Sequence, residues 1–493
     1  MLKKYILALD QGTTSSRAIL FNQNFEIIGI EQSETRQIYP QQSYVEQNAI
    51  EIRETQLYVA RKLIAKLAVN IDEIAGIGIT NQRETTIIWD KNTGEPIYNA
   101  IVWQDKRSSQ FCEQVRNSEF GNYINTKTGL VVDAYFSASK IKWILDNVEN
   151  AREKAENSEL LFGTVDTWLV WNLSQGKLHI TDYSNASRTM LFDIHSLQWD
   201  EEILNFFNIP KQILPKVVNS SQIYGKTALG IFGNKQIDIA AIAGDQQAAL
   251  FGHNCFNIGD VKNTYGTGCF MLMNTGEKIV ESKTGLITTI AWGLNNKITY
   301  ALEGSVFIAG AAIQWLRDNL KIIESANETE EIALSVENNG GVYFVPAFAG
   351  LGAPYWDMNA KAAISGISGG TNYKHIVRAA VEAMAFQTKD VLEAMKKDAK
   401  IEINLLNVDG GAASNNFLLQ FQADILNLDV LKPKIIESTA LGIAFMVAIA
   451  TKFKTLDEIL KIRKIEKKFT PKMKESERNF VYSQWLEAVD RVR

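Results

Sequence analysis

Cysteine and histidine are both scarce in this chain of 493 residues. It has three cysteines, Cys112, Cys255 and Cys269, and only four histidines. Neither set shows the spacing of metal ligands, so we expect the histidines to be structural. Few and widely separated cysteines suit a reducing compartment without structural disulfides. The sequence therefore predicts a cytoplasmic protein.

Long apolar runs and an excess of positive charge are missing as well. The longest apolar stretch, residues 441–450, is too short to span a bilayer. Asp10 interrupts the first apolar run too early for a signal peptide. A formal net charge of -5 argues against nucleic acid as the main partner. We expect a globular protein that is not embedded in a membrane.

The length of the chain exceeds that of one ordinary hydrophobic core, which predicts two domains. No low-complexity linker separates them. Glycine-rich turns recur in both halves, and an apolar helix is expected to end near Gly252. We therefore predict one lobe over residues 1–253 and a second over residues 254–493.

The first seventeen residues predict a β-hairpin with a polar turn. Apolar residues 5–9 and 18–21 flank Asp10-Gln11-Gly12-Thr13-Thr14-Ser15-Ser16-Arg17. Glycine allows a ligand to approach the backbone, hydroxyls and amides can hold phosphates, and Asp10 can contact Mg²⁺. A plain polar surface turn is the alternative.

Two further glycine-rich turns support the phosphate interpretation. Residues 262–273 predict a second hairpin around Gly266-Thr267-Gly268, and residues 408–416 predict a strand that runs through Gly410-Gly411 into a helix. Ligands in such folds bind at the carboxyl ends of strands. One nucleotide held between two related lobes would explain all three turns.

Two polar segments are candidates for the chemistry. Arg83 and Glu84 lie side by side between apolar strands and could bind vicinal hydroxyls, although a surface ion pair is the competing interpretation. Asp245 lies where an apolar strand is expected to give way to a helix, as a catalytic carboxylate or an N-cap. Residues 304–316 predict a helix with small residues on one side, facing either a nucleobase or another helix.

These segments resemble the glycerol kinases of the FGGY carbohydrate kinase family, which share the fold of actin and the heat-shock chaperone ATPases. The resemblance runs nearly end to end through strings such as ALDQGTTSSRAI, DGGAASNNFLLQFQADIL and ESTALGIA, and NQRET, SNASRTM and GDQQAALFG are specific to glycerol kinases. It implies an α/β fold with two actin-like, ribonuclease-H-like lobes, mixed sheets flanked by helices, and a ligand cleft between the lobes. It also implies ATP-dependent, Mg²⁺-assisted phosphorylation of glycerol to sn-glycerol 3-phosphate.

The resemblance assigns site residues position by position. It implies Asp245 as the general base and Asp10 as the carboxylate associated with Mg²⁺. The residues implied for glycerol binding are Arg83, Glu84, Trp103, Tyr135, Asp245, Gln246 and Phe270. Those implied for nucleotide binding are Thr13, Thr14, Ser15, Arg17, Thr267, Gly310, Gln314, Gly411 and Asn415. We also expect a homo-oligomer, a dimer or tetramer.

The loop before the expected catalytic strand departs from the family pattern. Residues 229–236 contain no arginine for fructose 1,6-bisphosphate, and no histidine for phosphorylation lies between His195 and His253. Two other functions stay open: a kinase of another small polyol or triose such as dihydroxyacetone, and a non-catalytic actin-like nucleotide clamp. A clamp would have no use for Arg83, Glu84 and Asp245.

Overall fold

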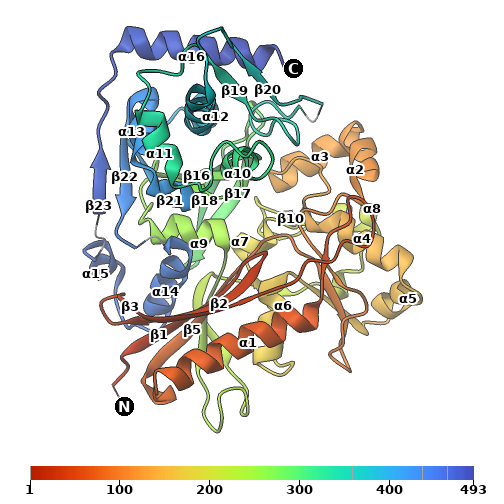
Figure 1. Ribbon diagram of the computed structural model, residues 1–493. Coiled ribbons are helices and arrows are strands. Elements are labelled where there is room, and N and C mark those ends of the chain that lie inside the picture. The colour runs from red at the N-terminus through yellow and green to blue at the C-terminus, as the bar shows by residue number, and fades with distance from the viewer. Residues whose placement is uncertain (1, 358, 436, 463–464) are drawn as a thin grey trace.

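One mixed sheet of thirteen strands runs through the molecule in the computed structural model, which describes residues 2–357, 359–435, 437–462 and 465–493 (Figure 1). From one edge to the other its strands are β23 (Ile465–Phe469), β22 (Asp429–Pro433), β21 (Leu405–Gly410), β15 (Val261–Tyr265), β16 (Cys269–Gly276), β18 (Lys297–Val306), β17 (Ile287–Leu294), β13 (Ser221–Lys226), β14 (Asp238–Gly244), β5 (Ile74–Asn81), β1 (Tyr5–Gln11), β2 (Ser15–Asn22) and β3 (Ile27–Glu34).

The two halves of this sheet repeat one pattern. In the first half, β1, β2 and β3 form an antiparallel meander, and β5 and β14 continue the sheet in parallel from β1. In the second half, β15, β16 and β18 form the meander, and β21 and β22 continue it in parallel from β15. A single pair, Ser221 and Leu294, joins the halves. The predicted α/β fold with two related lobes is confirmed.

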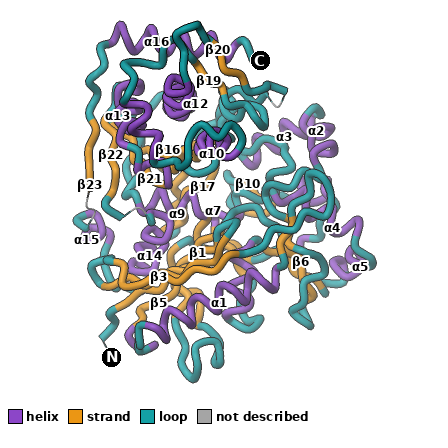
Figure 2. The backbone as a smooth tube through the Cα atoms, viewed as in Figure 1, coloured by secondary structure: helices purple, strands orange, loops and turns teal. Residues whose placement is uncertain are grey.

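Helices cover both faces of the first half of the sheet because β1 is apolar on both sides. Leu7 and Leu9 pack in one core with α1 (Ala49–Lys66), while Ile6 and Ala8 pack in another core with α14 (Ser438–Ala450). Successive strand residues point to opposite faces, so this alternation places the two helices on opposite sides of the sheet. Figure 2 shows α1 and α14 on either side of these strands.

Helix α14 connects the two halves of the chain. It is near the C-terminus in sequence, yet it packs against α9 (Asp245–Gly252) and strands β1, β5 and β14. A helix from the end of the chain therefore completes the core of the first half, so the two halves of the sheet do not correspond to two continuous halves of the chain. The predicted boundary between residues 253 and 254 stays a prediction.

The remaining elements surround this sheet. The other helices are α2 (Ser109–Arg116), α3 (Glu119–Thr128), α4 (Ser137–Asn147), α5 (Ala151–Glu156), α6 (Val165–Leu173), α7 (Tyr183–Ala186), α8 (Glu201–Phe207), α10 (Gly310–Asp318), α11 (Glu328–Leu334), α12 (Tyr373–Ala399), α13 (Asn416–Leu426), α15 (Leu456–Leu460) and α16 (Glu475–Asp490). Short paired strands are β4 (Glu46–Gln47) with β7 (Ala100–Ile101), β6 (Ile87–Asp90) with β8 (Leu160–Gly163), β9 (Ile180–Asp182) with β12 (Lys216–Val218), β10 (Phe192–Asp193) with β11 (Gln198–Trp199), and β19 (Tyr343–Val345) with β20 (Ala363–Ser365).

The predicted helix over residues 304–316 is partly wrong. Residues 304–306 complete β18, which pairs with strands on both sides, and the helix begins only at Gly310. A continuous run of small and apolar residues suits a buried strand as well as a helix. The neighbouring strand β16 decides the outcome, because it pairs with residues 304–306 along one edge of β18.

The structure bears on three expectations drawn from composition. In the described part of the chain, no helix has the length and apolar character needed to cross a bilayer. Cys112, Cys255 and Cys269 are all buried, and none of the three forms a disulfide. The histidines have structural partners: His375 completes the capping box of α12, and His253 pairs with Asp409 at 3.1 Å.

Candidate active site

The first hairpin presents its hydroxyls at the end of β1. The turn closes with a bond from Gly12 N to Ser15 O of 2.9 Å, and it leaves Thr13 and Ser15 half-buried and Thr14 exposed. The predicted hairpin is confirmed. The residues of the turn are therefore not fully buried, as a phosphate-binding turn requires.

Asp10 is nearly buried below this turn and is held by Arg17. The Arg17 Nε and Nη2 atoms both donate to Oδ2 of Asp10, at 3.1 Å for Nε, and Nη1 donates to Glu437 at 2.7 Å. Arg17 therefore ties the first hairpin to the residue that precedes α14. Its guanidinium occupies one carboxylate oxygen of Asp10 and leaves Oδ1 for another partner.

Trp103 and Tyr135 lie beside the same turn. The indole Nε1 of Trp103 donates to the Thr13 hydroxyl at 3.0 Å, and the Trp103 and Tyr135 rings meet edge to face with centroids 5.5 Å apart. Lys140 supports the segment that carries Tyr135, because its ammonium donates to the carbonyl oxygens of residues 134–136. Burial raises the pKa of Tyr135, so its hydroxyl stays protonated and can donate.

Arg83 and Glu84 follow the end of β5 after one intervening residue, Gln82, and are buried, with 3% and 1% of their surfaces exposed. Glu84 has a left-handed backbone with φ of 62°, which is uncommon for a residue other than glycine. This reversal ends the alternation of the strand and brings the two side chains within 3.9 Å of each other. The alternative of an exposed surface ion pair is therefore wrong.

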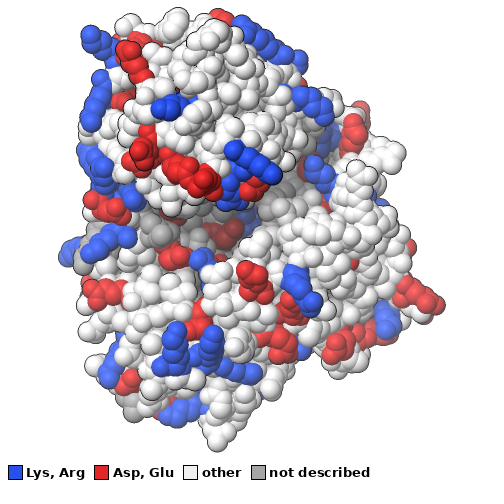
Figure 3. Space-filling view, viewed as in Figure 1, with Lys and Arg blue, Asp and Glu red and all other residues white. Residues whose placement is uncertain are grey.

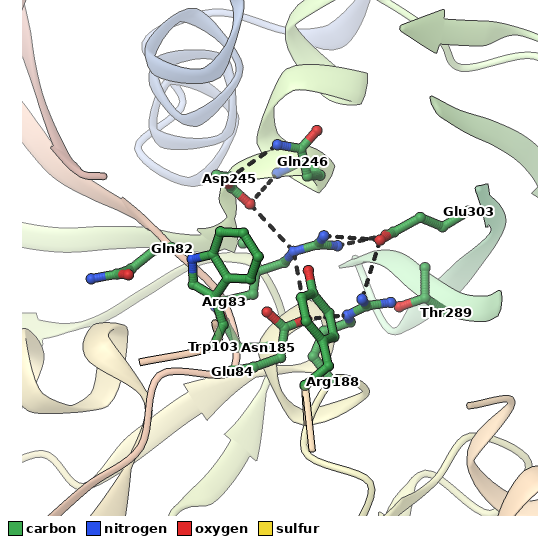
Figure 4. Close-up of polar contacts among 12 residues, drawn as sticks. Gln82, Arg83, Glu84, Trp103, Asn185, Arg188, Asp245, Gln246, Thr289 and Glu303 are labelled. Carbon is green, nitrogen blue, oxygen red and sulfur yellow. Dashed lines mark hydrogen bonds and ion pairs between the residues drawn. The ribbon is translucent and has the colours of Figure 1, made fainter. Parts of the chain in front are cut away.

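Two charged residues to which the sequence analysis gave no role complete this cluster. Glu303 on β18 accepts from Arg83 Nη1 at 2.6 Å and Nη2 at 2.9 Å, and from Arg188 Nη2 at 3.1 Å (Figure 4). Arg188 also donates from Nε to Glu84 at 2.6 Å. Burial disfavours the Glu303 carboxylate, but the charges of Arg188 and Arg83 outweigh it and lower the pKa of Glu303 to about 2.

Sequence reasoning had only a weak signal for these two residues. Arg188 lies in the string SNASRTM, which carried the resemblance, and Glu303 lies on β18 immediately before the helix predicted over residues 304–316. The charge of Glu303 indicates a partner only once β18 is placed opposite Arg83. The residues around Glu303 in the sequence do not indicate that β18 will lie opposite Arg83.

Asp245 is the first residue of α9, directly after the buried strand β14. An N-cap side chain accepts from an amide two or three residues ahead. The cap position is instead Gly244, and the backbone amide that donates to Asp245 Oδ1 is that of the next residue, Gln246, at 2.7 Å. The N-cap alternative is therefore wrong. Oδ1 lies 3.3 Å from Arg83 Nε, and a third of the side chain is exposed (Figure 4).

A pocket of about 580 Å³ opens in the second half of the molecule. Its walls include Thr267, Gly310, Gln314, Gly411 and Asn415, the residues predicted for the nucleotide in this half. Figure 3 shows this face of the molecule hollowed between its upper and lower parts. The structure brings five residues from three distant segments to one cavity.

The backbone around this pocket depends on close contacts. Ala309 N donates to Thr267 O at 2.8 Å and Gly310 N to Gly266 O at 3.0 Å, so the second hairpin holds the start of α10. A Cβ on Gly310 would lie 2.6 Å from Gly266 O, which explains the glycine. Phe270, which is predicted to lie beside glycerol, is half-buried on β16, the second strand of this hairpin.

Models of known protein families match most of the chain. The N-terminal domain of the FGGY family of carbohydrate kinases matches residues 5–252, and the C-terminal domain of that family matches residues 261–451. The chain belongs to the FGGY family of carbohydrate kinases.

Individual members of this family are similar to the chain over its full length. Glycerol kinase 2 of Thermotoga maritima is 59% identical over 489 residues, with 99% of this chain and 98% of that protein covered. The glycerol kinase of Clostridium perfringens strain 13 is 58% identical, with 99% and 98% covered.

Solved structures of FGGY kinases agree with the fold. The crystal structure of Plasmodium falciparum glycerol kinase with ADP superimposes with a TM-score of 0.94 at 38% identity, covering 100% of this chain and 99% of that chain. A ligand-bound xylulose kinase from Lactobacillus acidophilus superimposes with a TM-score of 0.89 at 20% identity, covering 99% and 98%. At that identity the xylulose kinase shows a shared fold alone.

Proposed function

We infer that this FGGY kinase is an ATP:glycerol 3-phosphotransferase, which converts glycerol to sn-glycerol 3-phosphate. The observation that carries the inference is the Asp245 carboxylate 3.3 Å from the buried Arg83 guanidinium, at the end of β14. A base beside a buried, hydroxyl-binding ion pair suits a small polyol. The full-length similarity to glycerol kinases of other organisms points to the same substrate.

We propose that the acceptor site lies between the first hairpin and α9. Arg83, Glu84 and Tyr135 bind the glycerol hydroxyls, because a guanidinium donates, a carboxylate accepts and a phenol does both. Trp103 and Phe270 contact the carbon chain. Asp245, with Gln246 beside it, accepts the proton of the attacking hydroxyl during in-line transfer.

The nucleotide is proposed to extend from the first hairpin to the pocket of the second half. Thr13, Thr14, Ser15 and Arg17 contact phosphates, and Thr267, Gly310, Gln314, Gly411 and Asn415 hold the rest of the nucleotide. Supporting this, the five residues of the second half line one pocket. Closure of the lobes then excludes water, which would compete as the acceptor.

Asp10 is the residue that would hold Mg²⁺. Mg²⁺ keeps several waters and binds one or two carboxylates together with substrate phosphates, so a single carboxylate with one free oxygen fits. No cluster of three or more metal-binding side chains occurs among the described residues, which agrees with a metal that arrives with the nucleotide. When bound, Mg²⁺ would neutralise charge on the phosphates.

Cellular context and substrate range are the less specific parts of the proposal. Use of ATP and three buried cysteines outside disulfides support a cytoplasmic location. We propose a homo-oligomer, dimer or tetramer, which light scattering would measure. A kinase of another polyol or triose is the alternative, and ADP release with glycerol and dihydroxyacetone as acceptors separates the two.

The replacement Asp245→Asn tests the mechanism. We expect kcat to fall by about 10²–10⁴-fold with nucleotide binding retained, because the base is lost and the shape is kept. Asp238→Asn is the matched control, since Asp238 starts the same strand and pairs with Lys226 at 2.6 Å far from the site. A near-normal kcat in Asp245→Asn would refute the assignment of the base.

A further inference from the structure

We propose that Lys262 is a positioning residue for phosphoryl transfer, which acts on the Asp245 base by fixing the orientation of the Gln246 amide. The proposal rests on the proposed function of Asp245. Lys262 lies on β15 in the second half of the sheet, whereas Asp245 and Gln246 begin α9 after the last parallel strand of the first half. The contact therefore joins the two halves at the site.

All three donors of the Lys262 ammonium have acceptors. Lys262 has no exposed surface, and its Nζ donates to Gln246 Oε1, to Thr264 Oγ1 at 3.0 Å and to Phe270 O at 3.2 Å. A lysine ammonium has three hydrogens to donate and accepts none. The side chain is thus held in one place by its partners.

This donor-only character decides which way the Gln246 amide points. Its oxygen must face Lys262, so its NH₂ group faces Asp245, where Nε2 lies 3.2 Å from Oδ2. The Gln246 backbone amide holds the other oxygen, Oδ1, at 2.7 Å. The Asp245 carboxylate is therefore held at both oxygens. If the amide were reversed, its carbonyl oxygen would face the carboxylate and repel it.

Lys262 also places the base relative to the nucleotide pocket of the second half. The strand that carries Lys262 leads directly into the Tyr265–Thr267 segment of the nucleotide pocket. Phe270 on the return strand, which is proposed to contact glycerol, accepts from the same ammonium. Lys262 thus contacts Gln246, which holds the proposed base, and Phe270, which is proposed to contact glycerol, and its own strand leads to the nucleotide pocket.

The charges around Lys262 predict a pH dependence. The groups that face it are Asp245 on α9, Asp409 on β21, Glu303 on β18 and Arg83 after β5. Burial lowers the pKa of Lys262 to about 8, against the attraction of the three carboxylates. Below this pH the ammonium fixes the amide. Above it the positive charge and one of the three N–H donors are lost, so Lys262 holds the Gln246 amide oxygen less firmly and kcat should fall.

The test compares Lys262→Met with Asn263→Leu. Asn263 is the matched control, because it is equally buried on the same strand, points to the opposite face and bonds to Thr388 at 3.3 Å. We expect Lys262→Met to lower kcat about 10- to 100-fold, the scale of a small misplacement, with the KM for glycerol nearly unchanged. Asn263→Leu should lower thermal stability and leave kcat within about twofold of the wild type. A Lys262→Met enzyme with wild-type kcat would overturn the proposal.

A double variant separates positioning through Gln246 from a direct effect of the lysine charge. Gln246→Leu alone should lower kcat as Lys262→Met does, and the double variant should be no slower than either single one. Losses that multiply would refute action through Gln246. Glycerol-dependent ADP release by the wild type is measured first, so failure of the proposed function shows there and failure of positioning shows in the variants.

The pH profile keeps the proposal testable if Lys262→Met does not fold. The wild type should lose kcat above about pH 8, and Gln246→Leu should not, because that variant has no side-chain amide for Lys262 to hold. A fall near pH 8 that persists unchanged in Gln246→Leu would overturn the proposal.

Discussion

Glu303→Gln should disconnect the proposed glycerol site from the second half of the sheet. Glu303 is buried on β18 and accepts two bonds from Arg83 and one from Arg188. Glutamine has the same shape but no charge, and its NH₂ group cannot accept. The variant therefore leaves the two buried arginines with one buried carboxylate, Glu84, and with the partly exposed Asp245 carboxylate 3.3 Å from Arg83 Nε.

The expected magnitude follows from the hydrogen bonds that glutamine cannot make at this position. Breaking a buried ion pair by removing one partner costs about 3–5 kcal/mol of stability. A hydrogen bond to a charged group contributes about 1.5–3 kcal/mol, and Arg83 depends on two of them for its position. If the free energy of one such bond is lost from glycerol binding, the Kd for glycerol rises about 10- to 100-fold. ATP affinity should change little, because Glu303 is not among the residues that line the nucleotide pocket.

Glu382→Gln is the matched control for this prediction. Glu382 is also a buried glutamate, and it accepts from Arg378 at 2.7 Å within α12. Both variants should lower the unfolding temperature, and only Glu303→Gln should weaken glycerol binding. Titration calorimetry with glycerol and with a nucleotide measures the two affinities. A glycerol Kd within about threefold of the wild type in Glu303→Gln would refute the positioning of Arg83 by Glu303.

Three further predictions concern the two ligands and regulation. Arg83→Ala or Glu84→Ala should weaken glycerol binding with little effect on ATP, and a larger loss for ATP in calorimetry would contradict the assignment of this pair. Gly411→Leu should raise the KM for ATP without lowering the unfolding temperature, because a Cβ at Gly411 meets no atom within 4 Å yet the residue lines the pocket; an unchanged KM would count against this pocket as the nucleotide site. Activity should be insensitive to millimolar fructose 1,6-bisphosphate, since residues 229–236 offer only Lys235, already paired with Asp72, in place of arginines; inhibition that disappears in Lys235→Ala would show that one lysine suffices.

Much of the fold could be predicted from local sequence. The β1–β2 and β15–β16 hairpins and the step from β21 into α13 each have apolar runs joined by glycine-rich turns, and all three are confirmed. The junction at Asp245 is confirmed in the same way. The exception is residues 304–309, where an apolar run without periodicity suits two structures equally.

The candidate site was predicted less completely. The turns that carry Asp10, Asp245 and Gly411 follow from local patterns, and the resemblance supplied the proposed roles. Burial of Arg83 and Glu84, and the left-handed backbone that brings them together, could not be inferred from their neighbours in sequence. Lys262 reads locally as one polar residue in a strand, and nothing nearby indicates that it contacts Gln246.

The sequence by itself determined the strands, the glycine turns and the family, because each depends on residues adjacent in the chain. Tertiary structure alone decided the charge network. Glu303 lies 220 residues after Arg83 and 115 after Arg188, and only the pairing of β18 between β16 and β17 places it opposite both. The physical reason is that a charge is stable inside a protein only beside its partner, and which partner it meets depends on how the strands and helices pack.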